Sequence, residues 1–245
     1  MASNSEKTHA KNLENLHIAN GIVANVGGIF KPTNALIQSA ALTDFESEFG
    51  TNMQAVNAAL TNEQTKVGEQ IAAFKMVSNR VSKIIKAAKG QGLAPEFLAN
   101  LRSTANRLNG IRVSEKTPDN PETPQDESAA NHSVSRRSYA GILESLDLLD
   151  EQIKNNPDWN SNEADYQPAA ITTWVDDLRA KHNAALDAKI NTRAVRNTRN
   201  AHAYTPTSGI LVRMNALKNY AETILDKNDM RLRQLKKLKF VDYSK

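Results

Sequence analysis

The chain has 245 residues, of which 40% are hydrophobic, 24% charged and 5% aromatic, and its formal net charge is +4. It contains no cysteine, which excludes disulfides, thiolate zinc sites, iron–sulfur clusters and cysteine nucleophiles. This apolar content and length allow a buried core, so a wholly disordered chain is excluded. No apolar run approaches the roughly 18 residues that span a bilayer. Because the first residues also lack an apolar signal segment, we expect a cytoplasmic protein.

Spacings of three and four between apolar residues predict helices along most of the chain. The predicted helices cover residues 11–26, 35–89 (with a bend near 78–79), 95–109, 136–155, 168–203, 209–226 and 228–239. Residues 1–10 are polar, and we expect them to be frayed. The turn at 30–34 contains Thr33 and Asn34, either of which can cap the element that follows it.

A polar segment separates two helical regions. Residues 114–135 contain three prolines, and within them residues 115–127 carry five acids against one base. Such a segment cannot bury enough apolar surface to pack, so we predict a disordered acidic linker. The sequence thus predicts two helical units, 11–113 and 136–245, the second ending in a basic helix.

The two predicted units match each other at a nearly constant offset. Leu16 pairs with Leu143 and Leu108 with Leu235 at one offset, and at almost the same offset Phe30 pairs with Trp159 and Phe45 with Trp174. Two units that each expose an apolar seam would bury it against one another. We therefore predict an all-α fold: an elongated pseudo-two-fold helical bundle made of two duplicated units with long helices.

Three regions carry a family resemblance. They are Leu16–Gly21 together with Phe30–Asn34, the stretch His132–Ser135, and the stretch Gln234–Phe240. These regions resemble uncharacterised, cysteine-poor, all-helical bacterial proteins. The resemblance covers most of the chain and implies a helical fold, but it implies no activity.

No motif supports catalysis or a cofactor. Gly90-Gln91-Gly92 follows a predicted helix rather than a strand, so it does not fit a dinucleotide fingerprint. Residues 158–162 begin like a calcium loop but lack the glycine and the closing glutamate of such a loop. Acids such as Asp150 fall at predicted helix-surface positions and form no cleft for acid–base catalysis. We expect no enzymatic activity, no metal, no cofactor and no small-molecule substrate.

Our first hypothesis is a non-catalytic structural or scaffold protein. The apolar stripe of the long predicted helix must be covered by partner helices, in this chain or in another, so we expect self-association to a homo-oligomer or binding of partner helices. The candidate association seam consists of Phe45, Phe49, Met53, Val56, Leu60, Val67, Ile71 and Phe74.

Two alternatives remain open. The first is a nucleic-acid-binding helical protein that uses basic residues on one helix face and near the C-terminus. The candidate contacts are Arg193, Arg196, Arg199, Arg231, Arg233, Lys236, Lys237 and Lys239. No recognition motif or aromatic stacking platform accompanies them. The second is a membrane-active protein that uses the apolar run 18–30, which is too short to span a bilayer. We expect that run to be a buried helix and expect no membrane partner.

Overall fold

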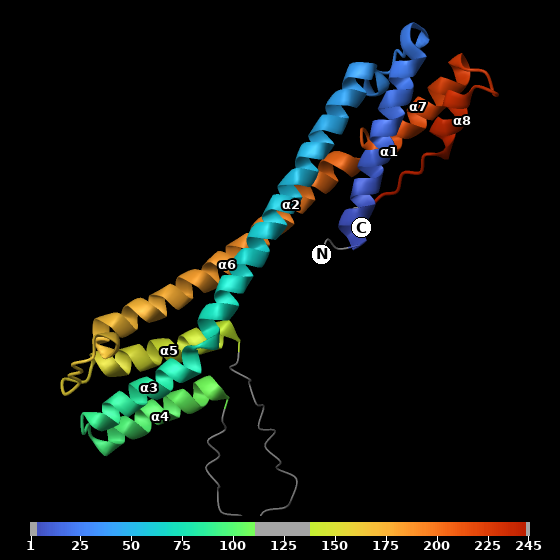
Figure 1. The fold of residues 1–245 in the computed structure, drawn as a ribbon. Coiled ribbons are helices and arrows are strands. Elements are labelled where there is room, and N and C mark those ends of the chain that lie inside the picture. The colour runs from blue at the N-terminus through green and yellow to red at the C-terminus, as the bar shows by residue number, and fades with distance from the viewer. Residues whose placement is uncertain (1–3, 111–137, 244–245) are drawn as a thin grey trace, which may run out of the picture. The chain divides into compact units, whose positions relative to one another are not determined.

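The computed structural model describes residues 4–110 and 138–243, and every regular element in these ranges is helical (Figure 1). The α-helices are α1 Asn4–Val26, α2 Ser39–Lys75, α3 Val77–Gly90, α4 Pro95–Asn109, α5 Tyr139–Lys154, α6 Pro168–Tyr204, α7 Ile210–Ile224 and α8 Met230–Lys237. The 3₁₀ turns in the same ranges are η1 Gly27–Ile29, η2 Ala35–Ile37 and η3 Ala164–Tyr166. The predicted all-α class is confirmed, whereas the predicted linker 114–135 lies outside the described residues.

The structure differs most from the prediction in two of the helices. The polar start of the chain predicts fraying to residue 10, but α1 already begins at Asn4, and His9 in its second turn is fully buried. The single helix predicted over 35–89 is also divided, because a turn at Met76 separates α2 from α3. This break is associated with the burial of Val77 and Val81 in a core that α3 forms with α4 and α5.

Contacts divide the chain into two compact units. Unit 1 consists of Met1–Gln64 and Ala188–Lys245, and unit 2 consists of Thr65–Asp187, so the boundaries fall within α2 and α6. This division differs from the one that the sequence predicts. Each unit combines elements from both halves of the chain, because the apolar faces of the first half are buried against elements of the second half within each unit.

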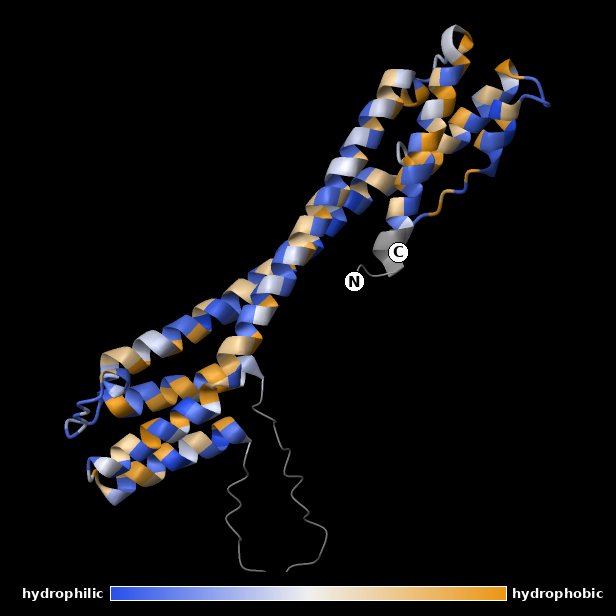
Figure 2. Cartoon of the chain, viewed as in Figure 1, coloured by the Kyte–Doolittle hydropathy of each residue, from blue (hydrophilic) through white to orange (hydrophobic). Residues whose placement is uncertain are grey.

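The core of unit 1 lies among α1, the first part of α2, the last part of α6, α7 and α8. Its fully buried members include Leu16 on α1, Phe49 on α2 and Leu217 on α7. Apolar and polar residues alternate around these helices, as amphipathic helices require (Figure 2). Asn34 caps η2 by accepting a hydrogen bond from the Leu36 N–H, which agrees with the predicted cap, and Asp229 caps α8.

The core of unit 2 lies among α3, α4, α5 and the adjoining parts of α2 and α6. Ile84, Leu101 and Leu146 are fully buried in it. The α3–α4 turn uses Gly92 at a φ of 68°, a conformation that residues with a Cβ rarely adopt, and Pro95 occupies the first turn of α4.

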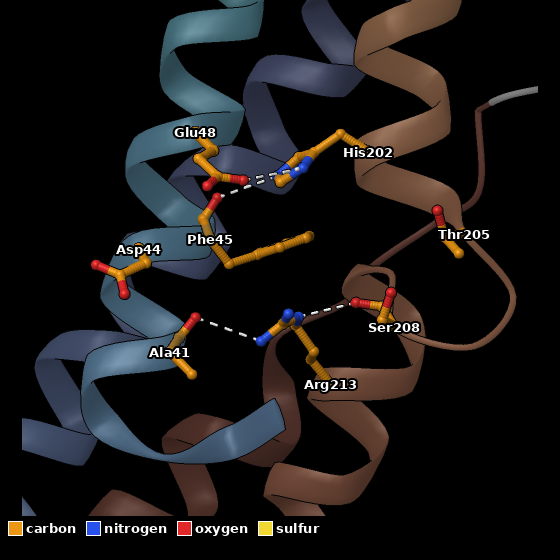
Figure 3. A pocket seen from close by; sticks show the side chains of 8 residues that line it. All are labelled: Ala41, Asp44, Phe45, Glu48, His202, Thr205, Ser208 and Arg213. Carbon is orange, nitrogen blue, oxygen red and sulfur yellow. Dashed lines mark hydrogen bonds and ion pairs between the residues drawn. The ribbon is translucent and has the colours of Figure 1, made fainter. Parts of the chain in front are cut away.

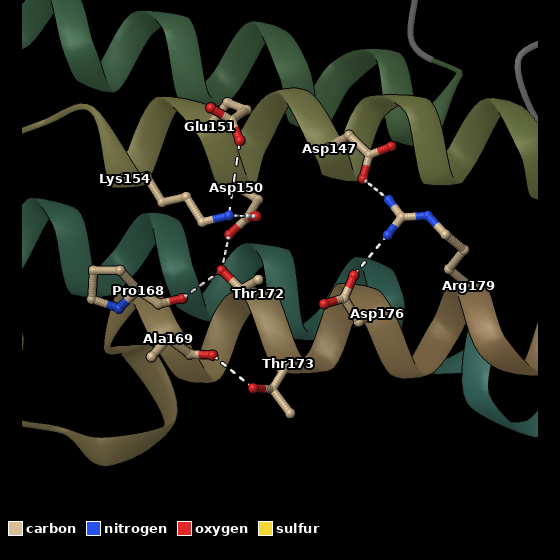
Figure 4. Close-up of polar contacts among 10 residues, drawn as sticks. All are labelled: Asp147, Asp150, Glu151, Lys154, Pro168, Ala169, Thr172, Thr173, Asp176 and Arg179. Atoms are coloured by element: carbon tan, nitrogen blue, oxygen red, sulfur yellow. Dashed lines mark hydrogen bonds and ion pairs between the residues drawn. The ribbon is translucent and has the colours of Figure 1, made fainter.

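A polar layer joins α5 to α6 inside unit 2 (Figure 4). Asp150 is buried there, although the sequence placed it at a helix surface. Its carboxylate accepts hydrogen bonds from the Thr172 hydroxyl at 2.8 Å and from the Lys154 ammonium at 2.7 Å. Nearby, the Arg179 guanidinium pairs with Asp147 and Asp176. Thr172 and Lys154 satisfy the carboxylate of Asp150, which gives this residue a structural role.

The predicted association seam is mostly covered by this chain itself. Phe45, Phe49, Met53, Val56 and Phe74 are buried in the two units. Leu60 and Val67 are partly buried, and Ile71 is 52% exposed. The buried members are therefore unavailable to a partner, because helices brought by the tertiary fold already cover them.

Candidate interaction site

The segment after α8, residues 238–243, is extended and runs back along α1 (Figure 1). The Asn12 side-chain amide donates to the Val241 carbonyl at 2.7 Å, and its oxygen accepts from the Val241 N–H at 3.3 Å. One turn further on, the Asn15 amide donates to the Lys239 carbonyl at 2.7 Å. Both asparagines are buried. They bind the main chain of the segment, much as a neighbouring β-strand would.

Aromatic groups hold the far end of this segment. The Tyr204 hydroxyl lies 2.6 Å from Nδ1 of His9 and accepts a hydrogen bond from the Asn12 amide at 3.1 Å. The His9 ring meets the Tyr243 ring edge to face at a centroid distance of 5.6 Å. Burial raises the pKa of Tyr204 to about 12, although the hydrogen bond from Asn12 opposes this. The phenol is therefore neutral at physiological pH.

Lys218 on α7 contacts the same segment from another side. Its ammonium donates to the Leu238 carbonyl at 2.6 Å and lies 5.9 Å from the centre of the Phe240 ring. Burial lowers the pKa of this ammonium. A pocket of about 320 Å³ adjoins these groups and is lined in part by Met214 and Lys236. We call the set of His9, Asn12, Asn15, Tyr204 and Lys218 the docking cluster.

A second pocket in unit 1, of about 360 Å³, is lined by Phe45, His202 and Arg213 among others (Figure 3). The Arg213 guanidinium donates to the carbonyls of Leu36 at 2.6 Å, Ser208 at 2.8 Å and Ala41 at 3.3 Å. It also lies 4.5 Å from the centre of the Phe45 ring. Burial lowers the pKa of the guanidinium.

His202 lies on the other side of Phe45. Its ring stacks on the Phe45 ring at a centroid distance of 4.6 Å, and its Nδ1 is 3.3 Å from a carboxylate oxygen of Glu48 (Figure 3). Arg213, His202 and Glu48 in this pocket therefore already contact backbone carbonyls, a ring or each other.

Unit 2 contains a counterpart of the Arg213 contact. There the Arg80 guanidinium lies 4.7 Å from the centre of the Trp174 ring and donates to the Asp165 carbonyl at 3.3 Å. Trp174 is the sequence match of Phe45, and at the same offset Asp165 is the match of Leu36. In each unit an arginine thus links the helix on which it lies to a 3₁₀ turn and to an aromatic ring. A contact that recurs in both units is best explained as support for the fold.

The two asparagines of the docking cluster have no such counterpart on α5. The buried stripe of α1 matches that of α5 at the offset that pairs Leu16 with Leu143, and this offset pairs Asn12 with Tyr139 and Asn15 with Ile142. Neither of these α5 residues carries an amide. The sequence match between the two helices therefore does not account for the asparagines of α1.

The predicted basic residues do not form one open face. Arg199 is only 2% exposed and donates to the Asn200 side chain, whereas Arg193 is exposed and Arg196 is half-buried. The remaining predicted residues differ in their partners. Arg231 pairs with Asp229 and Lys236 with Glu222, both at 2.6 Å, Arg233 donates to Asn228, and Lys237 and Lys239 have exposed side chains.

Sequence reasoning missed the whole docking cluster. The sequence did contain a signal for the α1 members. His9, Asn12 and Asn15 are spaced three apart and extend the apolar stripe of Leu16 and Ala19 toward the N-terminus. Polar residues on a buried helix face need partners inside the protein. The sequence does not indicate that those partners come from residues 204 and 238–243.

The chain matches no protein family, no curated protein and no solved structure. In residues 4–110 and 138–243, no group of three or more metal-ligating side chains is placed to hold an ion. No helix of these ranges combines the length and the apolar content needed to cross a bilayer.

Proposed function

We propose that this protein is a non-catalytic scaffold that self-associates by exchanging the segment 238–243 between copies. In the exchanged form, the segment of one copy occupies the docking cluster of another. The observation that carries this proposal is the contact of Asn12 with both the N–H and the carbonyl of Val241. That contact recognises an extended main chain, which is the usual basis of peptide recognition by added strands.

The chemistry of the contact is the same whichever copy supplies the segment. The segment leaves α8 at Leu238, where the backbone is already extended, with φ −67° and ψ 122°. A change in a few backbone dihedrals at this position redirects the segment without altering α8. Exchange then preserves every native contact, so the protein concentration decides between the closed and the exchanged form.

Self-association through the segment 238–243 does not use the predicted association seam. Since most of that seam is buried, association through it would require unfolding of a core. Exchange of the segment 238–243 leaves the buried core of unit 1 in place, because its side chains Leu238, Phe240 and Tyr243 are only partly buried against that core. The backbone of the segment is held by side-chain hydrogen bonds from Asn12, Asn15 and Lys218 rather than by a sheet ladder, and Val241 is exposed to solvent.

We further propose that the scaffold arose by internal duplication with pseudo-two-fold character. In support, α2 and α6 each contain 37 residues and start at the offset that relates Phe45 to Trp174. Each follows a 3₁₀ turn, and each carries the aromatic residue of an arginine contact, Phe45 on α2 and Trp174 on α6.

Size-exclusion chromatography with light scattering over a wide range of concentration tests the proposed function. We expect a concentration-dependent dimer or larger species for the full chain. A chain ending at Lys237 is expected to be monomeric. The double variant N12A/N15A weakens the contact in the closed and the exchanged form alike, so a monomer with a released segment becomes populated and association is expected to decrease. The control N191A changes an exposed asparagine on α6 and is expected to behave as the full chain does.

Two results would overturn the proposal. The first is a full chain that stays monomeric at every concentration, and the second is an oligomer that persists without residues 238–245. The same experiment is repeated with a mixed-sequence oligonucleotide. A change in mass only when the oligonucleotide is present would favour nucleic-acid binding. Against that alternative, several of the candidate arginines and lysines already have partners within unit 1.

A further inference from the structure

The apolar run 18–30 is buried for only part of its length. Ile22, Val23 and Val26 lie in the core of unit 1, as predicted for a buried helix. After them the chain turns through Gly27 at a φ of 65°, and Ile29 in η1 is 55% exposed. The run therefore ends with a large aliphatic side chain in solvent.

A second exposed apolar residue lies at the same end of unit 1. Met230, the first residue of α8, is 71% exposed. The neighbouring Arg231 donates to the Asn25 carbonyl at 3.1 Å, which holds the start of α8 against the end of α1. Two segments from opposite ends of the sequence thus meet at this end of unit 1, and each carries one exposed apolar residue, Ile29 or Met230. We call this part of the unit, together with its flanking cations, the α1–α8 end.

The flanking charges at the α1–α8 end are mainly positive. Lys31, Lys227 and Arg233 have exposed side chains. Asp229 is paired with Arg231, whose guanidinium lies 2.6 Å from the carboxylate. Asp226 is also present, and its carboxylate accepts a hydrogen bond from the Asn228 N–H. Exposed aliphatic groups among cations are complementary to an interface that has an apolar layer beneath negative charge.

The corresponding turn of unit 2 lacks this combination. At the offset that relates Phe30 to Trp159, Ile29 corresponds to Asp158 and Lys31 to Asn160. Both of these unit 2 residues are exposed. The aromatic residue that supports the turn is thus present in both units, whereas the exposed Ile and Lys occur only in unit 1. They are therefore not required by the turn itself.

We infer that the α1–α8 end of unit 1 binds the surface of a bilayer that contains anionic phospholipid. Ile29 and Met230 enter the interfacial layer, while Lys31, Lys227 and Arg233 face the phosphate groups. Nucleic acid would satisfy the cations but would leave the two aliphatic side chains without a function. This surface is separate from the docking cluster, so the inference does not depend on segment exchange.

Co-sedimentation of the full chain with vesicles tests the inference. One set of vesicles contains phosphatidylcholine alone, and the other also contains phosphatidylglycerol. We expect binding to the second set, weakened by salt, and a roughly tenfold lower partition coefficient for the double variant I29D/M230D. The variant K31Q/K227Q is expected to lose a similar factor at low salt. The control I71D/I190D places the same two charges at positions on α2 and α6 that are 52% and 65% exposed, and it is expected to bind normally.

Each remaining outcome counts against the inference. Absence of binding to the phosphatidylglycerol vesicles overturns it, as does unchanged binding of I29D/M230D. A milder pair, I29S/M230Q, is used if circular dichroism shows that the aspartate variant is not folded. If an oligonucleotide binds the full chain and I29D/M230D equally and displaces the vesicles from both, the basic residues form a nucleic-acid surface instead.

Discussion

Replacement of Arg213 by methionine, compared with the same replacement at Arg80, tests whether the arginine contacts support the fold. Methionine retains an unbranched apolar stem of similar length, so the packing of the stem is largely kept while the guanidinium is removed. The two sites are matched in kind, since each arginine lies over an aromatic ring and donates to a carbonyl of a 3₁₀ turn. They differ in the number and length of their hydrogen bonds.

The structure predicts a larger loss at Arg213. Its two short hydrogen bonds, to Leu36 and Ser208, contribute about 1 kcal/mol each. The contact with the Phe45 ring adds about 0.5–1 kcal/mol, and relief of the burial of the charge offsets part of the loss. We expect R213M to lower the free energy of unfolding by about 2–3 kcal/mol. R80M loses one long hydrogen bond and one ring contact, so we expect about 1 kcal/mol.

Hydrogen–deuterium exchange is the appropriate assay, because a chain with two units need not unfold in one step. R213M is expected to lower the protection of amides in α7 and in the first turns of α2, and R80M that of amides in α3. A value for R213M within about 0.5 kcal/mol of the unmodified protein would refute the reasoning, and so would a larger effect of R80M than of R213M.

Three further predictions concern stability. The pKa of Tyr204 is about 12 in the folded protein and its ordinary value is 10, so the free energy of unfolding should fall by on the order of 2 kcal/mol as the pH rises from 10 to 12. Alkaline unfolding of Y204F should lack this component, and an equal loss in both proteins would contradict the prediction. A Cβ at Gly209 would lie 2.6 Å from the Thr205 carbonyl oxygen, so G209A should lower the free energy of unfolding by about 3 kcal/mol or more. Gly68 lies in open space within α2, so G68A should raise it by about 1 kcal/mol. Urea unfolding measures both changes. R179M should change the unfolding free energy by less than about 1 kcal/mol, because its ion pairs are solvent-accessible; a larger loss would show that the polar layer of unit 2 is a cooperative network.

Local sequence signals located the helices well where the chain itself contains the stop signal. The helix over 95–109 has the predicted bounds, because Pro95 suits its first turn and Gly110, in a left-handed conformation, ends it. The predicted start of α6 at Pro168 is also confirmed. At Met76, by contrast, no proline or glycine marks the break between α2 and α3, and the predicted bend lay slightly later, at 78–79. That break accompanies packing of α3 in unit 2, which periodicity alone does not report.

Less of the candidate site than of the fold could be predicted from the sequence. The asparagines of α1 are visible as polar positions on an apolar stripe, but their partners lie near the other end of the chain. The charge pattern was also ambiguous. A spacing of three placed Arg193, Arg196 and Arg199 on one predicted face, yet Arg199 is buried because that part of α6 enters the core of unit 1.

The sequence by itself determined the all-α class, most helix positions and the exclusion of cysteine chemistry, because these depend on residue type and on spacings within a few turns. Only the tertiary structure decided which surfaces are covered. Helical periodicity defines an apolar stripe, but burial depends on which distant segment packs on it, and here elements from both halves of the chain cover the stripe of α2. For the same reason only the tertiary structure brought residues 238–243 to α1, and Met230 to the end of unit 1 at which Ile29 leaves the core.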